Sequence, residues 1–447
     1  MPDRPLPTDS DGSFPNRVSD ERSSMRPAPP QGDPPPPPSK ERLRNLLKQQ
    51  YKSFLLPPDP SSSQKPQTST KQTVRLQLPP KPDTTGAVKL NLPPKPSVPE
   101  FLHSPPPKED PSFDKFNDAA ALALGEVLGI PEEDIPFISI VVAAPPDKQQ
   151  ILSVKQSLGL AYPPDRFEII VARGRQPSVQ RNNAVKESKG SLIYFLDDDS
   201  VPYMGNLILA VERFKDAEVQ VVGGPNLVPP DSPRLERSFG EVMGSWLAFG
   251  PSQARYRQIG KTRESGEKEL ILCNMVFRKS AFEKHGGFDE ALYPNEENAL
   301  MDAIQNDGGK LIYDPDFLVH RRPRQSLGAF CKMLMNYGRG RAEQFRLHPT
   351  LGSAPNFVPP AFLLYLLAAP FLPMWALWPL SVYTLAVVMQ VVALDPMVIF
   401  SIPRLAPLIF MSHLFYGAGF IKGLFTRLKP KDQPSNVEVV LERISPA

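Results

Sequence analysis

Predominantly apolar runs alternate with helical patterns from about residue 136 onward. The apolar runs occupy 138–142, 167–171 and 192–196, and the helical patterns occupy 149–158 and 181–188. Continuous apolar runs are typical of strands that are buried on both faces. Strands that alternate with helices predict a doubly wound, mostly parallel α/β sheet, which binds ligands at the carboxyl ends of its strands. The pattern also predicts strands at 219–222, 270–277 and 310–313, and a helix at 297–305.

A purely apolar pattern follows the predicted sheet. Residues 357–394 contain no charged side chain, and a further apolar segment, 396–421, is interrupted by Arg404. At about 1.5 Å per helical residue, the first stretch is long enough to cross a hydrocarbon core of about 30 Å close to twice. Prolines together with Trp375 and Trp378 predict a tight turn at an interface. The pattern therefore predicts that this protein is bound to a membrane.

The orientation of these segments is open. Arg339, Arg341 and Arg346 precede the first segment, so the positive-inside rule predicts a cytoplasmic globular part at a bacterial-type inner membrane. Lys422 and Arg427 follow the last segment, and the same rule places them inside as well. Three full crossings cannot satisfy both. Either one segment lies in the interface plane or is re-entrant, or the rule fails here.

The first quarter of the chain has a different composition. Residues 1–111 hold 27 of the 56 prolines and few aromatic side chains, which predicts a disordered proline-rich tail. Within it, the segment 74–82 recurs fourteen residues later as 88–96. A low-complexity linker is one interpretation, and bivalent docking of a protein partner is the other. Residues 112–133 are predicted to be a helical lead-in.

Three carboxylates end the strand predicted at 192–196. Asp197, Asp198 and Asp199 are adjacent, and like charges in a row disfavour one another's ionisation. A divalent cation removes this cost, because hard oxygen ligands suit Mg²⁺ or Mn²⁺ and the metal can then bridge to phosphates. A solvated acidic turn is the alternative interpretation.

Charge and cysteine content exclude some classes of function. The net charge of +3 on 447 residues does not suggest binding of nucleic acid. The two cysteines, Cys273 and Cys331, form neither a disulfide framework nor a metal-ligand spacing, and they fit a reducing compartment.

Several motifs, in their order and spacing, resemble the family 2 glycosyltransferases, in particular membrane-anchored enzymes of succinoglycan-type exopolysaccharide synthesis. The motifs that carry the resemblance are Pro136-Phe-Ile-Ser-Ile-Val-Val142, Phe195-Leu-Asp-Asp-Asp199, Val222-Gly-Gly-Pro-Asn226, Ala254-Arg-Tyr-Arg257, Leu270-Ile-Leu-Cys-Asn274, Gly286-Gly-Phe-Asp289, Pro294-Asn-Glu-Glu297, His320-Arg-Arg322, Tyr337-Gly-Arg-Gly-Arg341 and His413-Leu-Phe-Tyr-Gly-Ala-Gly-Phe420. The resemblance covers about residues 134–425. It implies a GT-A catalytic domain at 134–325, an amphipathic helical linker at 326–356, membrane segments at 357–421 and a basic tail at 422–447.

The resemblance also implies a reaction and a set of site residues. A sugar would pass, with inversion, from a nucleotide-diphosphate donor to a lipid-linked or polymeric glycan acceptor used in cell-surface polysaccharide. Mg²⁺ or Mn²⁺ would be held by Asp199, Asp197 and His320, and Glu297 or its neighbour Glu296 would take the proton of the attacking hydroxyl. Donor contacts are expected from Asp147, Asp197, Arg181, Arg339 and Arg341, the last two contacting either the pyrophosphate or anionic lipid headgroups.

Two strand ends depart from the family pattern. The first predicted strand is followed by Ala143-Ala-Pro-Pro-Asp147, which keeps only the final acid, and the second ends in the basic sequence Val171-Ala-Arg-Gly-Arg175. The nucleotide of the donor is therefore not predicted. Two alternatives remain at this point: a glycosyltransferase that acts on polyprenyl phosphate itself, and a degenerate glycosyltransferase that recruits partners through its proline-rich tail.

Overall fold

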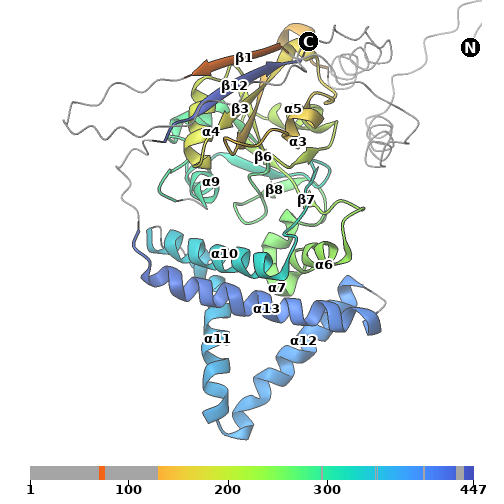
Figure 1. The fold of residues 1–447 in the computed structure, drawn as a ribbon, viewed down its shortest axis with the longest axis vertical. Helices are drawn as coiled ribbons and strands as arrows, with labels where there is room; N and C mark the ends of the chain where they lie inside the picture. The colour runs from red at the N-terminus through yellow and green to blue at the C-terminus, as the bar shows by residue number, and fades with distance from the viewer. Residues whose placement is uncertain are drawn as a thin grey trace, which may run out of the picture. The chain divides into compact units, whose positions relative to one another are not determined.

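A nine-stranded mixed sheet forms the centre of the protein. The computed structural model describes residues 70–75, 129–292, 295–347, 349, 351–395, 398–428 and 437–446. In order across the sheet the strands are β1 (Thr70–Arg75), β12 (Val440–Ser445), β3 (Phe167–Arg173), β2 (Ile138–Ala144), β4 (Leu192–Asp197), β9 (Asn274–Arg278), β6 (Val219–Gly223), β10 (Lys310–Tyr313) and β8 (Arg263–Ser265) (Figure 1). A second, three-stranded sheet consists of β5 (Val201–Pro202), β11 (Val319–His320) and β7 (Asn226–Leu227).

Most strands of the large sheet run in one direction. β2 pairs in parallel with both β3 and β4, and β10 pairs in parallel with β6. β9 lies antiparallel between β4 and β6, so those two strands also point the same way. The predicted doubly wound, mostly parallel α/β sheet is therefore confirmed, and the carboxyl ends of β2, β3 and β4 share one edge.

Hydrophobic cores cover both faces of this sheet, because neighbouring residues of a strand point to opposite sides. Ile140 packs into one core with α3 (Leu152–Ser157) and α5 (Asn206–Phe214), whereas Val141 packs into the other. The second core contains α4 (Pro177–Lys186), α8 (Lys279–Lys284) and α9 (Glu296–Asn306). Short 3₁₀ turns link the elements: η2 (Glu132–Asp134), η3 (Pro164–Arg166), η4 (Gly250–Arg255), η5 (Leu351–Phe357), η6 (Ala369–Phe371) and η7 (Met374–Leu377).

Two predicted boundaries were wrong. The strand predicted at 270–277 begins only at Asn274, because the residues before it form a turn in which the Asn274 amide donates to the Ile271 carbonyl. α4 begins at Pro177 rather than at Arg181, since proline favours the first helical position. Apart from β1, the tail predicted at 1–111 lies outside the described residues, and so does the predicted lead-in at 112–133 up to residue 128.

The C-terminal strand β12 was not anticipated from the sequence. It pairs antiparallel with β3 on one side and with β1 on the other. Two ion pairs fasten it to β3: Arg443 with the buried Glu168 at 2.5 Å, and Arg173 with Glu442 at 2.8 Å. The last part of the chain is thus a strand of the central sheet.

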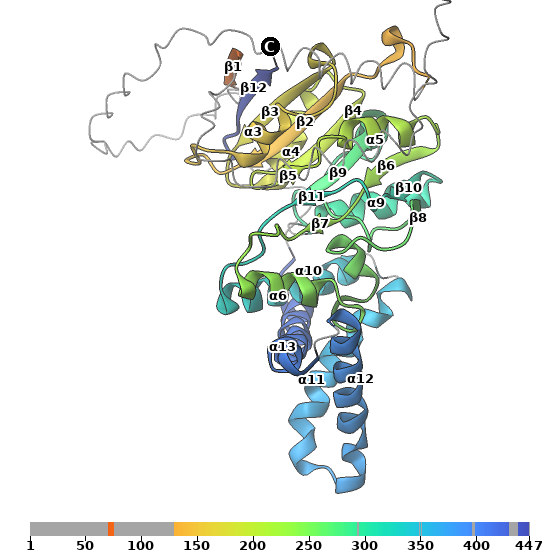
Figure 2. The same ribbon diagram turned by 90° about the vertical axis from the view of Figure 1, so that its right-hand side faces the viewer.

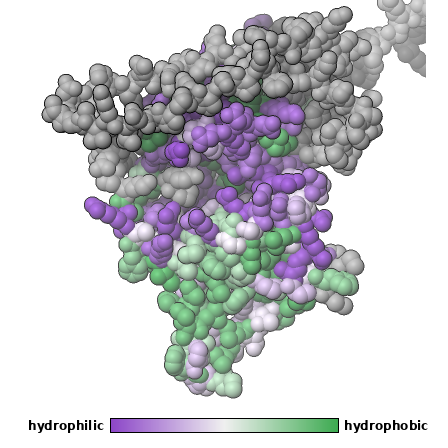
Figure 3. Space-filling model, viewed as in Figure 1, coloured by the Kyte–Doolittle hydropathy of each residue, from purple (hydrophilic) through white to green (hydrophobic). Residues whose placement is uncertain are grey.

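A group of helices forms a third hydrophobic core beside the sheet domain. It contains α6 (Arg234–Met243), α10 (Leu327–Leu347), α12 (Trp378–Leu394) and α13 (Val398–Phe425), with α7 (Trp246–Phe249) against them. α13 lies along α10, while α11 (Val358–Ala368) and α12 form a hairpin that projects away from both (Figures 1 and 2). The hairpin is apolar on the face that Figure 3 shows.

Three helical segments are long and apolar enough to cross a membrane: Gly352–Phe371, Met374–Leu394 and Phe400–Phe425. They overlap the predicted membrane region, 357–421, and extend beyond it at both ends. The third differs from the others, because 44% of its apolar window is buried inside the protein, compared with 6% and 11%.

Glycines allow α10 and α13 to touch through their backbones. A Cβ atom on Gly338 of α10 would lie 2.1 Å from the Tyr416 carbonyl oxygen, and one on Gly419 of α13 would lie 2.1 Å from the Met335 carbonyl oxygen. Any larger residue would force the helices apart. This contact accounts for one glycine in each of two sequence motifs, Gly338 in Tyr337–Arg341 and Gly419 in His413–Phe420.

Candidate active site

The aspartate triplet lies where the sequence places it, at the carboxyl end of β4. Asp197 is the last residue of the strand, and Asp198 and Asp199 form the turn before β5. Each carboxylate has a cationic partner. Asp198 pairs with Lys148 at 2.7 Å, and Lys148 follows β2 at the same edge of the sheet. The triplet is therefore a charge-balanced cluster at the edge where this kind of sheet binds ligands.

Arg321 bridges the other two aspartates. Its guanidinium lies 2.9 Å from Asp197 Oδ2, and its Nε lies 2.5 Å from Asp199 Oδ1. Burial alone would lower the pKa of Arg321, but the two carboxylates raise that pKa well above its ordinary value. Sequence reasoning included this arginine in the His320-Arg-Arg322 motif but gave it no role. Only the pairing of β11 with β5 and β7 brings Arg321 to the triplet.

Arg181 connects the triplet to the start of α9. Its guanidinium lies 2.9 Å from Asp197 Oδ1 and 3.2 Å from Glu296 Oε1, and the arginine side chain is buried. Burial opposes ionisation of Asp197, but Arg321 and Arg181 outweigh it, so the pKa of Asp197 is lowered. A predicted donor contact and a predicted catalytic acid thus belong to one network.

The acidic pair begins α9, as predicted, but its two members differ. Glu296 is buried, and burial together with the neighbouring Glu297 raises the Glu296 pKa to about 7, although Arg181 opposes the shift. Glu297 remains partly exposed. The preceding Asn295 has φ 135°, a strained conformation for a residue other than glycine, and its amide donates to Glu296 Oε2. The backbone is thus bent to direct Glu296 inward.

His320 is buried in β11, and its pKa is lowered to about 4 by burial, against the opposing effect of Asp231. Within the described ranges, no three or more His, Cys, Asp or Glu side chains gather closely enough to hold a metal ion, so His320 is not grouped with Asp197 and Asp199. Those two carboxylates nevertheless converge on one cation, the Arg321 guanidinium. Carboxylate oxygens that surround a cation suit Mg²⁺ or Mn²⁺, and the guanidinium occupies the place that such a metal ion would take.

The remaining predicted donor residues lie at different distances from this cluster. Asp147 is exposed in the turn after β2, beside the Lys148 that pairs with Asp198. Arg341 in α10 pairs with Glu267 at 2.9 Å, and Arg339 lies 3.6 Å from Glu343. Asp147 thus stands at the edge of the site, whereas the two arginines are engaged by acids outside the triplet.

The basic end of β3 is neutralised by the C-terminal strand. Arg173 pairs with Glu442 and donates to the Lys148 carbonyl oxygen at 2.8 Å. An acidic side chain therefore does stand beside the end of this strand, supplied by β12 rather than by β3 itself. Sequence reasoning could not find Glu442, because 269 residues separate it from Arg173.

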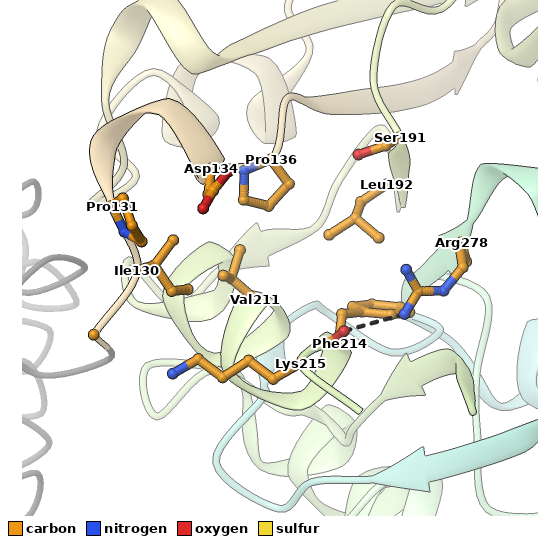
Figure 4. Close-up of a pocket in the computed structure, with 11 residues that line it drawn as sticks. Ile130, Pro131, Asp134, Pro136, Ser191, Leu192, Val211, Phe214, Lys215 and Arg278 are labelled. Atoms are coloured by element: carbon orange, nitrogen blue, oxygen red, sulfur yellow. Dashed lines mark hydrogen bonds between the residues drawn. The ribbon is translucent and has the colours of Figure 1, made fainter. Parts of the chain in front are cut away.

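A cavity of about 470 Å³ lies at the opposite edge of the sheet (Figure 4). Pro136 and Leu192 line it near the amino ends of β2 and β4, and Arg278, which donates to the Phe214 carbonyl oxygen, lines it at the end of the antiparallel β9. The length of β4 separates this cavity from the aspartate triplet, so it does not belong to the candidate active site.

A comparison with known protein families matches the part of the chain that contains the aspartate triplet. The family model "Glycosyl transferase family 2" matches residues 149–286. The pre-mycofactocin glycosyltransferases of two Mycobacterium tuberculosis strains, CDC 1551 and H37Rv, are 25% identical over 185 residues. That match covers 39% of this chain and 36% of each relative, so the chain spans only about a third of their length.

Solved structures that are similar to this chain include a mannosyltransferase and TarS. The mannosyltransferase PcManGT from Pyrobaculum calidifontis, in complex with GDP-Man and Mn²⁺, is 16% identical with a TM-score of 0.44, covering 65% of this chain and 87% of its own. TarS 1-349 from S. aureus in complex with UDP is 13% identical with a TM-score of 0.33, covering 64% and 90%.

The family match begins just before α3 and ends just after α8, so it includes α4 with Arg181 and the aspartate triplet. It stops before Glu296 and Arg321. Residues 149–286 of this chain are therefore similar to the glycosyl transferase family 2, and they form part of the mixed α/β sheet domain.

Proposed function

We propose that this protein is a membrane-bound, metal-dependent, inverting glycosyltransferase that uses a nucleotide-diphosphate sugar. Its acceptor is a lipid-linked or polymeric glycan of the cell surface, and the catalytic domain faces the cytoplasm. The observation that carries the proposal is Arg181, which joins Asp197 of the triplet to Glu296 of α9. This single side chain ties the expected donor-binding edge to the expected catalytic helix.

The donor diphosphate would lie at the carboxyl edge of β2 and β4. Lys148 and Arg321 supply positive charge there, and preorganised cations stabilise a departing diphosphate better than water does. Asp197 and Asp199 would hold a divalent cation, which would supply Lewis-acid stabilisation of the leaving group. His320 remains a predicted third ligand.

Glu297 would act as the general base. The acceptor hydroxyl attacks the anomeric carbon while the bond from that carbon to the diphosphate breaks, and the hydroxyl proton passes to a carboxylate. Glu297 is partly exposed at the start of α9, where an acceptor can reach it, whereas Glu296 is buried against Arg181. Glu296 is therefore a positioning residue that fixes the helix start, and Glu297 is the catalytic residue.

The test is transfer from a panel of labelled nucleotide sugars by membranes that contain the full chain, with Mn²⁺ or with EDTA. Lipid-linked glycans and polyprenyl phosphate are offered as acceptors in separate reactions. We expect Mn²⁺-dependent transfer from one donor to a lipid-linked glycan. Transfer to polyprenyl phosphate alone would replace the proposed acceptor, and the absence of transfer or hydrolysis with every donor and metal would overturn the proposal in favour of a non-catalytic scaffold.

A further inference from the structure

We propose that the protein enters the membrane from one side only, through the α11–α12 hairpin, and that α13 lies in the interface plane without crossing. The partner surface is a lipid bilayer. The inference rests on the membrane attachment in the proposed function, but not on sugar transfer.

The position of β12 excludes an odd number of crossings. β12 follows α13 in the chain, yet it pairs with β3 of the catalytic sheet from Ile444 to Val440. The Arg443 side chain also neutralises Glu168, which is 1% exposed and would otherwise be a lone buried charge. A chain that leaves a domain, enters a membrane and returns to the same sheet must cross an even number of times. The three candidate segments therefore cannot all span.

α13 is the segment that does not cross the membrane, because α10, the helix against which it packs, cannot enter the hydrocarbon core. α10 is bound to the catalytic domain by Arg341, which pairs with Glu267, and it packs against α13 through Gly338 and Gly419. At its end, Arg346 donates to the Gly423 carbonyl oxygen at 3.1 Å. Because α10 carries five charged side chains and lies beside α13, both helices must stay outside the hydrocarbon core. The five are Lys332, Arg339, Arg341, Glu343 and Arg346.

Arg404 supports the same placement from the second turn of α13. It pairs with Glu241 of α6 at 2.8 Å and donates to Ser238 of the same helix at 2.9 Å. α6 belongs to the segment between β7 and β8 of the catalytic domain. A charge within the apolar part of a crossing helix is costly, whereas here the ion pair of Arg404 fastens the first turns of α13 to the domain.

The hairpin has the opposite character. Its large apolar side chains are exposed around the turn, with Phe371 at 88%, Met374 at 84% and Trp375 at 77%. The two arms are the candidate spans Gly352–Phe371 and Met374–Leu394, of 20 and 21 residues, about 30 Å each at about 1.5 Å per residue, which matches a hydrocarbon core of about 30 Å. A charge-free hairpin of this reach accounts for an even number of crossings. Both ends of the hairpin then lie on the catalytic side, so the arginines before α11 and the cations after α13 obey the positive-inside rule together.

Single-cysteine variants of the full chain test this topology in sealed proteoliposomes. The native thiols, Cys273 and Cys331, are buried and are replaced by serine. Lys332→Cys on α10 and Arg427→Cys after α13 report the two ends, since both side chains are exposed, and Met374→Cys reports the tip. The probe is a membrane-impermeant maleimide, added before and after permeabilisation.

We expect the variants at 332 and 427 to react to the same extent from the same side, and the variant at 374 to react at least tenfold more slowly from that side. Reaction of 332 and 427 from opposite sides would overturn the proposal, as would labelling of 374 from that side as fast as that of 332 and 427. If the chain did not float with vesicles, it would not be attached to the membrane, and the proposal would be overturned as well. Because labelling needs no donor, a chain without transferase activity still gives a decisive answer.

Discussion

The Arg181 guanidinium lies 3.2 Å from the Glu296 carboxylate, yet the pKa of Glu296 is raised to about 7. Burial and the adjacent Glu297 outweigh the attraction of the arginine. Although Glu296 pairs with Arg181, it therefore keeps its proton up to a higher pH than an ordinary glutamate does. This relationship makes the stability of the catalytic domain depend on pH.

Glu296→Gln should remove part of that dependence. An unfolded glutamate ionises near pH 4.5 and the folded Glu296 near pH 7, so the folded state binds more protons in this window and the free energy of unfolding falls as pH rises through it. The melting temperature of the variant minus that of wild type should therefore be larger at pH 7.5 than at pH 5. Glu283→Gln, at an exposed position, is the control. An equal loss of stability at both values would mean that Glu296 is ionised throughout.

Asp199→Asn and Glu297→Gln should separate donor binding from chemistry. Asp199→Asn removes a charge from the expected cation site, so donor affinity in Mn²⁺ and turnover should both fall. Glu297→Gln should leave donor affinity nearly unchanged while single-turnover transfer falls by roughly 10²–10⁴-fold, the range for a lost general base. Calorimetry and quenched-flow transfer give the two readouts. Asp231→Asn, which lies in an exposed pair, is the matched control. Near wild-type transfer by Glu297→Gln would move the base to Glu296 or Asp302.

Arg321→Gln should strengthen binding of Mn²⁺ in the absence of donor. The arginine occupies the point between Asp197 and Asp199, so a metal ion must compete with a tethered cation. Mn²⁺ affinity measured by electron paramagnetic resonance should rise at least severalfold. The neighbouring Arg322→Gln, whose partner is the exposed Asp231, should leave the affinity unchanged. Weaker Mn²⁺ binding by Arg321→Gln would indicate that the arginine organises the site rather than competing for it.

Arg443→Met should destabilise the catalytic domain by about 3–5 kcal/mol, because it leaves the Glu168 charge buried without its partner. Adding Glu168→Gln in the same chain should restore most of the loss, since an uncharged amide needs no counter-ion. Chemical denaturation of the detergent-solubilised full chain measures both. No loss in the single variant would contradict the pairing of β12 with the sheet, on which the even number of crossings depends.

Arg404→Met should also lower stability, by about 1–3 kcal/mol, because Glu241 and Ser238 lose a charged hydrogen-bonding partner. In a helix that crosses lipid, replacing arginine by methionine would be favourable instead. The melting temperature in nanodiscs distinguishes the two cases. Thr384→Val, on the exposed apolar hairpin, serves as a control that should change little.

The sequence by itself determined the elements whose signal is local. Predominantly apolar runs identified β2, β3 and β4, because a strand buried on both faces shows little polar alternation, and the hydropathy pattern also predicted β6 and β10. The aspartate triplet and the acidic pair were also found in the sequence, since their chemistry lies in adjacent residues. The absence of charge over residues 357–394 likewise predicted the apolar helices without any knowledge of their packing.

Only the tertiary structure decided which distant residues meet. Arg321 reaches the triplet through the pairing of β11 with two short strands, and Glu442 reaches Arg173 across almost the whole chain. Hydropathy could not distinguish α13 from a crossing helix, because burial against α10 and burial in lipid select the same apolar residues. The proposal of an even number of crossings rests on the pairing of β12 with β3, and a pairing between backbones leaves little trace in the sequence of either strand.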